Sequence, residues 1–342
     1  MINPSDPPRS FLRLLAFPLL LCGLGIGAVV LFERLSRDGV NWFGEPRSDF
    51  RTIPPEWITY RQVSVFACPI AGQATCFALL NNSTFVIGSA DLPMLSLFDE
   101  KGNLLRKIDL AEEPRAVVCG TPETLFADNI VVAHSQNVTV YTAEGYLISS
   151  WKLPDKKSDV RSLVLTQKYL FAADTGKRCI YRLGADGNID LTFGENFVVY
   201  ATPITMSFSP KDDLLYISNP GRHRVEAFTQ DGECKPELFF GKPSVSLSGF
   251  VGCCNPIALA TLDDGRILTV EKSVSRAKIY SEGKLDGVVA GPGVLDHYPP
   301  EVKRPPAEPG GRYFSAVSLS GERIAVFDFS GQVIRIFEPR GS

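Results

Sequence analysis

The sequence predicts an all-β fold, a six-bladed β-propeller, preceded by a single transmembrane helix. Six apolar segments, each ending on a small or polar residue, recur as FVIGS, IVVAH, YLFAAD, LYISN, ILTVE and IAVFD. A second short apolar segment and a glycine follow each one, and the six glycines are Gly102, Gly145, Gly187, Gly232, Gly283 and Gly341. Their spacing of 42 to 58 residues is at or just above the length of a four-stranded blade.

The first element is an uncharged apolar run from Leu14 to Phe32. At 1.5 Å per residue it reaches roughly 28 Å, close to the thickness of a bilayer core. We therefore expect residues 1–35 to be a membrane anchor, with one transmembrane helix at about 14–32. The short head before it favours an orientation with the N-terminus inside, so the protein is expected in the cell membrane, single-pass, with the propeller outside the cytoplasm. Residues 36–58, which include Pro46, Pro54 and Pro55, are predicted to be a linker.

Residues 59–342 are predicted to form the propeller, with four strands per blade from the axis outward. In the fourth repeat, ELFFG is the expected outer strand. The sixth repeat has only three strands before the chain stops, whereas the segment Tyr60 to Ala67 has no partner in the first repeat. We expect this segment to supply the missing outer strand and close the ring, which removes the open sheet edges.

Charge restricts the kind of partner. The chain carries 35 Lys and Arg against 38 Asp and Glu, a formal net charge of -3, and the basic residues are scattered. No basic face is available to neutralise phosphates, so nucleic acid is an unsuitable partner.

One face of the predicted ring collects most of the polar residues of interest. Strand direction alternates within a blade, so the ends of the second strands and the loops between blades open on the same side. We expect a binding face there. Its candidate residues are Cys253, Cys254, Asn255, His134, Asp174, Asn219, Glu271 and Asp328.

Two segments, ADTGKRCIYRLGADG and SNPGRHRVEAFTQDG, resemble the NHL repeat family of propellers. The stretch from about Phe171 to Gly293 is similar to a group of bacterial, membrane-anchored NHL-type proteins. The residues that carry this likeness are a Gly-Cys-Cys-Asn-Pro motif followed by Glu-Lys and Arg-x-Lys. The resemblance implies a propeller fold and a bacterial envelope protein, and it implies no particular activity.

The polar strand ends have two interpretations. Oxygen atoms of Asp174, Asn219 and Glu271 could converge on a hard cation such as Ca²⁺, and such a metal could polarise a lactone or ester carbonyl. Alternatively, each side chain closes its own turn through an arginine four or five residues later, Arg178, Arg224 or Arg276. We favour this second interpretation.

The adjacent cysteines also allow alternatives. Cys253 and Cys254 could bind a soft metal, form a disulfide or take part in thiol exchange, and with Cys68 and Cys76 a four-thiolate site is conceivable. The spacing does not match a zinc ribbon. Alternatively, these cysteines have a structural role, either as a disulfide or as buried thiols.

The function that these observations favour is a binding or assembly platform at the membrane, with a protein partner on the face that carries Cys253 and Cys254. The chain has only three histidines and no Ser-His-Asp pattern or phosphate-binding glycine loop, so an enzyme is the less favoured class. The alternatives are a metal-dependent lactonase or esterase, and a thiol or metal site serving an envelope redox complex. No cofactor is indicated.

Overall fold

The computed structural model describes residues 51–341, except 82, 195, 201, 303–304 and 306–312. The predicted anchor, residues 1–35, and most of the predicted linker therefore lie outside the described residues. No helix among the described residues is long and apolar enough to cross a membrane.

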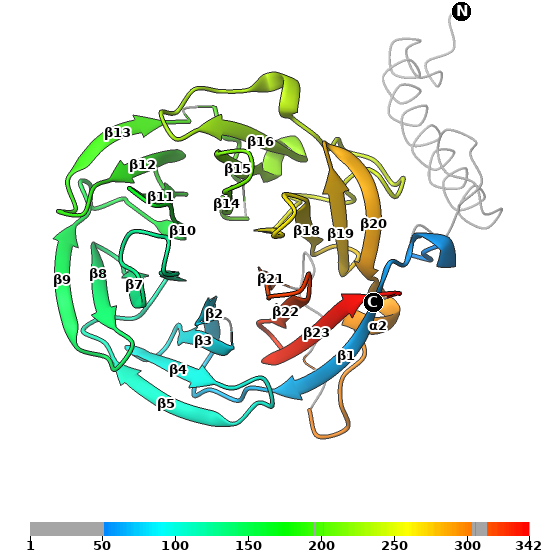
Figure 1. Cartoon of the computed structure of the whole chain (residues 1–342), viewed down its shortest axis with the longest axis horizontal. Coiled ribbons are helices and arrows are strands. Elements are labelled where there is room, and N and C mark those ends of the chain that lie inside the picture. The colour runs from blue at the N-terminus through cyan, green and yellow to red at the C-terminus, as the bar shows by residue number, and fades with distance from the viewer. Residues whose placement is uncertain are drawn as a thin grey trace, which may run out of the picture. The chain divides into compact units, whose positions relative to one another are not determined.

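Six antiparallel sheets are arranged around a central channel (Figure 1), and in five of them the strand that comes first in the chain is innermost. This confirms the predicted six-bladed all-β propeller. The first three blades are β2 (Ala74–Leu80), β3 (Thr84–Ser89), β4 (Met94–Phe98) and β5 (Leu104–Asp109); β6 (Ala116–Cys119), β7 (Asn129–Ala133), β8 (Asn137–Thr142) and β9 (Leu147–Lys152); and β10 (Val160–Leu165), β11 (Leu170–Asp174), β12 (Cys179–Leu183) and β13 (Ile189–Phe193).

The remaining blades include one with only three strands. They are β14 (Met206–Ser209), β15 (Leu214–Asn219) and β16 (Arg224–Thr229); β17 (Ala258–Thr261), β18 (Ile267–Glu271), β19 (Arg276–Ser281) and β20 (Lys284–Ala290); and β21 (Phe314–Ser318), β22 (Ile324–Asp328), β23 (Val333–Pro339) and β1 (Tyr60–Ala67).

Burial explains the apolar repeats. The second strands are covered on both faces by neighbouring blades, so β11 is buried at every residue. An outer strand such as β9 is instead mostly exposed or half-buried. The hydrophobic core consists of layers between blades, and one layer joins Val131 and Val140 of the second blade to Leu163 and Leu170 of the third. Continuous apolar runs are typical of strands covered on both faces.

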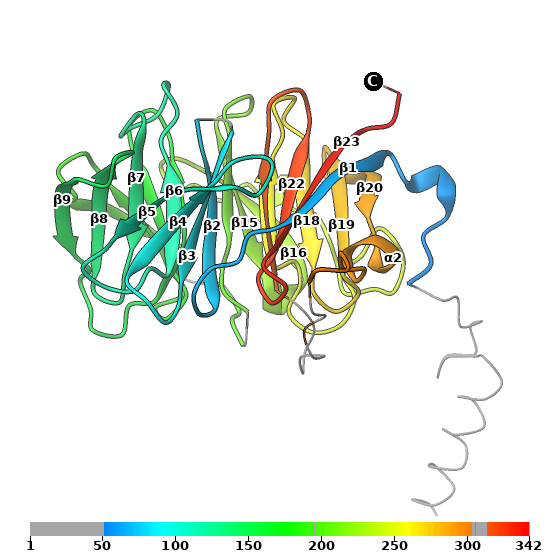
Figure 2. The same ribbon diagram turned by 90° about the horizontal axis from the view of Figure 1, so that it is seen from below.

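The predicted closure of the ring is confirmed. β1 pairs antiparallel with β23, from Tyr60 opposite Pro339 to Ala67 opposite Val333, and the two strands lie side by side in both views (Figures 1 and 2). The sixth blade is therefore built from both ends of the described chain.

The prediction of an outer strand at ELFFG is wrong. The fourth blade ends at β16, and only isolated bridges, Val225 with Phe240 and Phe228 with Cys234, continue the pairing. Pro236 has no N–H to donate to a sheet, which disfavours a strand here. A short 3₁₀ helix, η3 (Pro236–Leu238), begins at this residue instead.

The turn glycines of the repeat have a second role in packing. Gly187 has a φ of +76°, which glycine adopts without strain, and a Cβ there would lie 2.1 Å from Cγ of Trp151 in the preceding blade. The turns at Gly102, Gly145, Gly232 and Gly283 also face a side chain of the preceding outer strand or bridge. Five of the six blades therefore pack their outer turn against the preceding blade, while a Cβ at Gly341 would meet no atom within 4 Å.

The segment before β1 lies against the fifth blade. A 3₁₀ helix, η1 (Pro55–Trp57), precedes a parallel bridge between Ile58 and Val288 of β20. The N–H of Thr59 donates to the carbonyl of Val288 at 3.1 Å, and Ile53 approaches Gly291. Ile53 and Ile58, which belong to the predicted linker of residues 36–58, thus contact the fifth blade.

Candidate functional site

The central channel forms a cavity with a volume of about 1760 Å³. The inner strands of all six blades line it, and so do residues of the loops that lead into them, including Arg115, Asp159, Tyr200, Thr202 and Tyr313. Loops between blades and turns between second and third strands open on one rim of this channel, as the strand order requires. This rim is called the loop face below.

The six polar strand ends share one structural role: each binds the loop that leads into its own blade. The six bonds are Ser89 Oγ to the carbonyl of Ala71 (2.8 Å), His134 Nδ1 to the carbonyl of Glu113 (3.3 Å), the N–H of Asp159 to Asp174 Oδ1 (2.9 Å), the N–H of Val198 to Asn219 Oδ1 (3.0 Å), the N–H of Val251 to Glu271 Oε2 (2.8 Å) and the Tyr298 hydroxyl to Asp328 Oδ2. Five distant loops and one insertion are thereby fixed to the ring.

The predicted pairing of three strand ends with arginines holds fully for one of them. Arg276 Nε donates to Glu271 at 2.8 Å. Asn219 and the predicted Arg224 are joined instead through Glu226, which accepts from both at 2.8 and 2.7 Å.

The third strand end binds differently. Asp174 accepts the backbone N–H of Lys177 at 3.0 Å, and none of its hydrogen bonds goes to the predicted Arg178. Its Oδ2 atom is buried and has no hydrogen-bond partner among the described residues.

Both ring nitrogens of His134 have hydrogen-bond partners. Nδ1 donates to the carbonyl of Glu113, and Nε2 lies 2.7 Å from the Thr139 hydroxyl. The side chain is 1% exposed, and burial lowers its pKa. Both nitrogens are therefore occupied by structural bonds.

Glu271 organises the region around the Gly-Cys-Cys-Asn-Pro motif. Its carboxylate is fully buried and lies 2.8 Å from Arg276 and 3.0 Å from Lys278, while it also accepts from Val251. The Lys278 ammonium donates to the carbonyl of Gly249 at 2.5 Å. Glu271 and Lys278 thus fix the long loop, residues 241–257, to the fifth blade.

Asn255 connects this loop to the channel rim. Its Nδ2 donates to the carbonyl of Val251 at 2.6 Å, and its Oδ1 accepts the backbone N–H of Lys272 at 2.9 Å. Asn255 is fully buried. The nitrogen and the oxygen of the side-chain amide are therefore both hydrogen-bonded to backbone. The structural role of Asn255 is to fix Cys253, Cys254 and Lys272 relative to one another.

Lys272 is a functional candidate that the sequence analysis did not single out. Its ammonium is 2.9 Å from Thr202 Oγ1 and 3.5 Å from the Tyr313 hydroxyl, and it lies 5.0 Å from the centre of the Tyr313 ring. The residue is 5% exposed and forms no ion pair with any described residue. Its two neutral partners line the channel, so a buried positive charge stands at the loop face.

The two adjacent thiols occupy different environments. Cys253 is exposed, whereas Cys254 is 1% exposed, and their Sγ atoms are 2.9 Å apart. The hydrogen bond with Cys254, and then burial, raise the pKa of Cys253, while the charge of Lys272 opposes this shift. The pair is therefore a dithiol with one accessible sulfur.

The remaining predicted thiols do not join this pair. Cys68 and Cys76 belong to two different core clusters, and burial raises the pKa of each to about 12. Among the described residues, no three His, Cys, Asp or Glu side chains are grouped so that they could hold a metal. Asp174, Asn219 and Glu271 come from successive blades, and each uses a carboxylate or amide oxygen to hold a loop.

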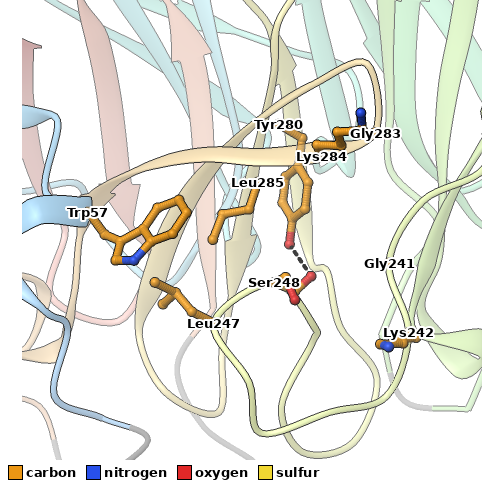
Figure 3. A pocket seen from close by; sticks show the side chains of 9 residues that line it. All are labelled: Trp57, Gly241, Lys242, Leu247, Ser248, Tyr280, Gly283, Lys284 and Leu285. Atoms are coloured by element: carbon orange, nitrogen blue, oxygen red, sulfur yellow. Dashed lines mark hydrogen bonds between the residues drawn. The ribbon is translucent and has the colours of Figure 1, made fainter.

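A smaller hollow of about 570 Å³ lies outside the channel, against the fifth blade (Figure 3). Trp57 and Leu285 face one another across it, with Leu247 nearby, and the Tyr280 hydroxyl donates to the carbonyl of Ser248 at 3.0 Å. The long loop and the segment before β1 therefore form its walls.

Comparisons with known proteins identify the architecture. No family model matches the chain, and no curated protein is similar to it in sequence. Similar solved structures include a protein of unknown function from Bacteroides thetaiotaomicron, with a TM-score of 0.59, 15% identity, and coverage of 82% of this chain and 75% of that one.

Two other similar structures are lyases. Virginiamycin B lyase from Staphylococcus aureus matches with a TM-score of 0.55 and 13% identity over 82% of this chain and 99% of that one. A streptogramin B lyase matches with a TM-score of 0.54 and 10% identity over 84% of this chain and all of that one. At these identities the likeness concerns the fold alone, and the chain is a six-bladed β-propeller.

Proposed function

We propose that this protein is a binding platform of the cell envelope, anchored by residues 1–35, whose propeller receives a protein partner on the loop face. The observation that supports this most directly is the Lys272 ammonium. A buried charge without a counter-ion is costly, and within the described part of the chain the Lys272 ammonium has only neutral oxygen partners beside the channel. A partner carboxylate, from an acidic side chain or a C-terminus, would supply the missing charge.

The surroundings of Lys272 suit a protein ligand. Tyr200 lines the same channel and is 74% exposed, and exposed tyrosines are enriched at binding interfaces. The exposed Cys253 belongs to the loop that Asn255 fixes to Lys272. Together these residues combine one charge, one aromatic side chain and a rigid loop.

An enzymatic role has less support from the same residues. Asp174, Asn219 and Glu271, the candidate metal ligands of a lactonase or esterase, use carboxylate or amide oxygens to hold loops. One structure of the S. aureus virginiamycin B lyase is of a catalytically inactive variant in which a histidine is replaced by alanine. No histidine is found among the described residues that line the channel here.

The test is affinity capture of the full chain from its native membrane in mild detergent, comparing wild type with Lys272→Met. Methionine preserves the length of the side chain and removes its charge. Lys211, which binds a carbonyl in the turn at Asp264 on the opposite face, gives a matched control as Lys211→Met. We expect the partner to be lost with the first variant and kept with the second. Recovery of wild type alone, as a monomer, would contradict the proposal.

The anchor is tested separately by fractionation. We expect the full chain in the membrane fraction, resistant to alkaline carbonate extraction, with the propeller digested by protease added to spheroplasts. A propeller protected until the spheroplasts are lysed would contradict the proposed orientation.

A further inference from the structure

The sulfur atoms of Cys253 and Cys254 lie unusually close for two free thiols. Their separation is 2.9 Å, and a disulfide bond is about 2.05 Å long. A movement of less than about 1 Å therefore separates the reduced pair from a bonded one. Of the remaining described cysteines, four are buried and Cys234 is exposed.

The backbone of the pair is held by contacts that do not involve sulfur. Cys254 has a φ of +63°, a left-handed conformation that is uncommon for a residue with a side chain and persists when the surroundings impose it. Glu271 fixes Val251 on one side, and Asn255 binds both Val251 and Lys272 on the other. The loop can thus keep the two thiols together in the reduced state.

The two sulfurs differ in access. Cys253 is exposed and can be reached by a disulfide in solution, while Cys254 is buried behind it and can reach only Cys253. The hydrogen bond with Cys254 and burial raise the pKa of Cys253, and the positive charge of Lys272 opposes this rise, so Lys272 adds to the fraction of the thiolate that acts as nucleophile. This is the division of labour between an attacking and a resolving thiol.

We propose that Cys253 and Cys254 form a redox-active dithiol that exchanges with an external disulfide at the loop face. The Cys253 thiolate attacks one sulfur of the external disulfide, a mixed disulfide forms, and the other sulfur leaves as a thiol. Cys254 then loses its proton and attacks Cys253, which releases the second thiol. The pair loses two electrons and two protons, and the external disulfide gains them. The proposal is independent of the binding function and of Lys272 having a partner.

The test uses the full chain carrying Cys234→Ser, which removes the other exposed cysteine of the described part. The reduced, folded protein is incubated with oxidised glutathione, quenched with an alkylating reagent, and the peptide that contains both cysteines is analysed by mass spectrometry. We expect this peptide to lose two hydrogen atoms and to carry no glutathione. The oxidised fraction should depend on the ratio of reduced glutathione squared to oxidised glutathione.

A matched variant separates the two steps. With Cys254→Ser added, the mixed disulfide cannot be resolved, so one glutathione should remain on Cys253; with Cys253→Ser instead, the buried Cys254 should stay free. Stable glutathione on Cys253 when both cysteines are present would overturn the proposal. So would a pair that reacts only after denaturation, provided circular dichroism shows the native protein to be folded.

Discussion

Arg276 and Glu271 form an ion pair of 2.8 Å between side chains that are 1% and 0% exposed. Lys278, also fully buried, is 3.0 Å from the same carboxylate, so one anion serves two cations in the interior of the fifth blade. The neighbouring Nη2 atom of Arg276 has no hydrogen-bond partner in the described structure. The stability of this blade therefore depends strongly on one carboxylate.

Replacing that carboxylate is the first prediction. Glu271→Gln leaves two buried cations without a counter-ion, which typically costs about 3–5 kcal/mol. The matched control is Glu100→Gln, which breaks a half-exposed pair with Arg323 of 3.0 Å and should cost about 0–1 kcal/mol. Denaturant unfolding measures both. Equal losses would contradict this account, and a loss of bound metal with unchanged stability would instead support the metal-ligand interpretation of Glu271.

The second prediction concerns pH. Burial lowers the pKa of Lys278 to about 8 from its ordinary 10.5. Between these values the unfolded chain binds more protons at this site than the folded protein does, so this group makes the protein more stable as pH rises from about 8 to 10.5. We expect the free energy of unfolding of wild type to rise, relative to Lys278→Met, between pH 7.5 and 10. A constant difference would show that Lys278 does not titrate in this range.

The third prediction concerns the reactivity of Cys253. Because the hydrogen bond with Cys254 raises its pKa, its reaction with maleimide should be slow at pH 7.5 and should still accelerate above pH 9. Cys254→Ala removes that hydrogen bond and should increase the rate at pH 7.5 several-fold. Mass spectrometry of native protein should find label on Cys253 and Cys234, which are exposed, and none on Cys119, which is buried. An unchanged rate in the variant would contradict the hydrogen bond between Cys253 and Cys254.

Closure of the ring gives the fourth prediction. Deleting residues 1–35 should leave the exported propeller soluble and folded. Deleting up to residue 59 also removes the contacts of Ile58 and Thr59 with β20 and should lower the melting temperature by several degrees. Deleting up to residue 68 removes β1, exposes the edge of β23 and should cause aggregation. Size-exclusion chromatography compares the deletions. If the shortest and the longest deletion behave alike, the role of β1 in closing the ring is contradicted.

The fifth prediction compares two glycines. Gly187 and Gly321 have φ values of +76° and +72°, but a Cβ at Gly187 would strike Trp151, whereas one at Gly321 meets no atom within 4 Å. Gly321→Ala should cost about 1 kcal/mol through the backbone alone. Gly187→Ala should cost clearly more, because Trp151 must also move. Chemical denaturation measures the difference. Similar losses of unfolding free energy would mean that Trp151 can move away from Gly187 at little cost.

The sequence predicted the fold well because the strands are short apolar runs whose turns carry glycine. The closing strand was placed at Tyr60 to Ala67, which are its observed bounds. The missing outer strand of the fourth blade was not predicted, since ELFF has the composition of a strand and Pro236 precedes it. The contacts of Ile53 and Ile58, in the predicted linker, were not predicted because they are made with Gly291 and Val288, far along the chain.

The candidate site was harder to predict because its contacts are between blades. Lys272 meets Thr202 across 70 residues of sequence, and nothing near either residue indicates that pairing. The strand ends were found from their pattern, but the loop partners of five of them are backbone groups, which carry no sequence signal. The one local signal was Lys272 itself, a charge directly after a buried strand, which could have been noticed.

The pairing of β1 with β23 has a consequence for how the molecule assembles in time. Arg61 and Glu338, which face one another there, are 277 residues apart along the chain, and bringing such distant segments together costs on the order of 5 kcal/mol of chain entropy. During synthesis β1 emerges early and has no partner until the C-terminal strand follows. The nascent protein must therefore keep a strand edge protected throughout translation, and a ribosome that stalls shortly before the end releases an open ring.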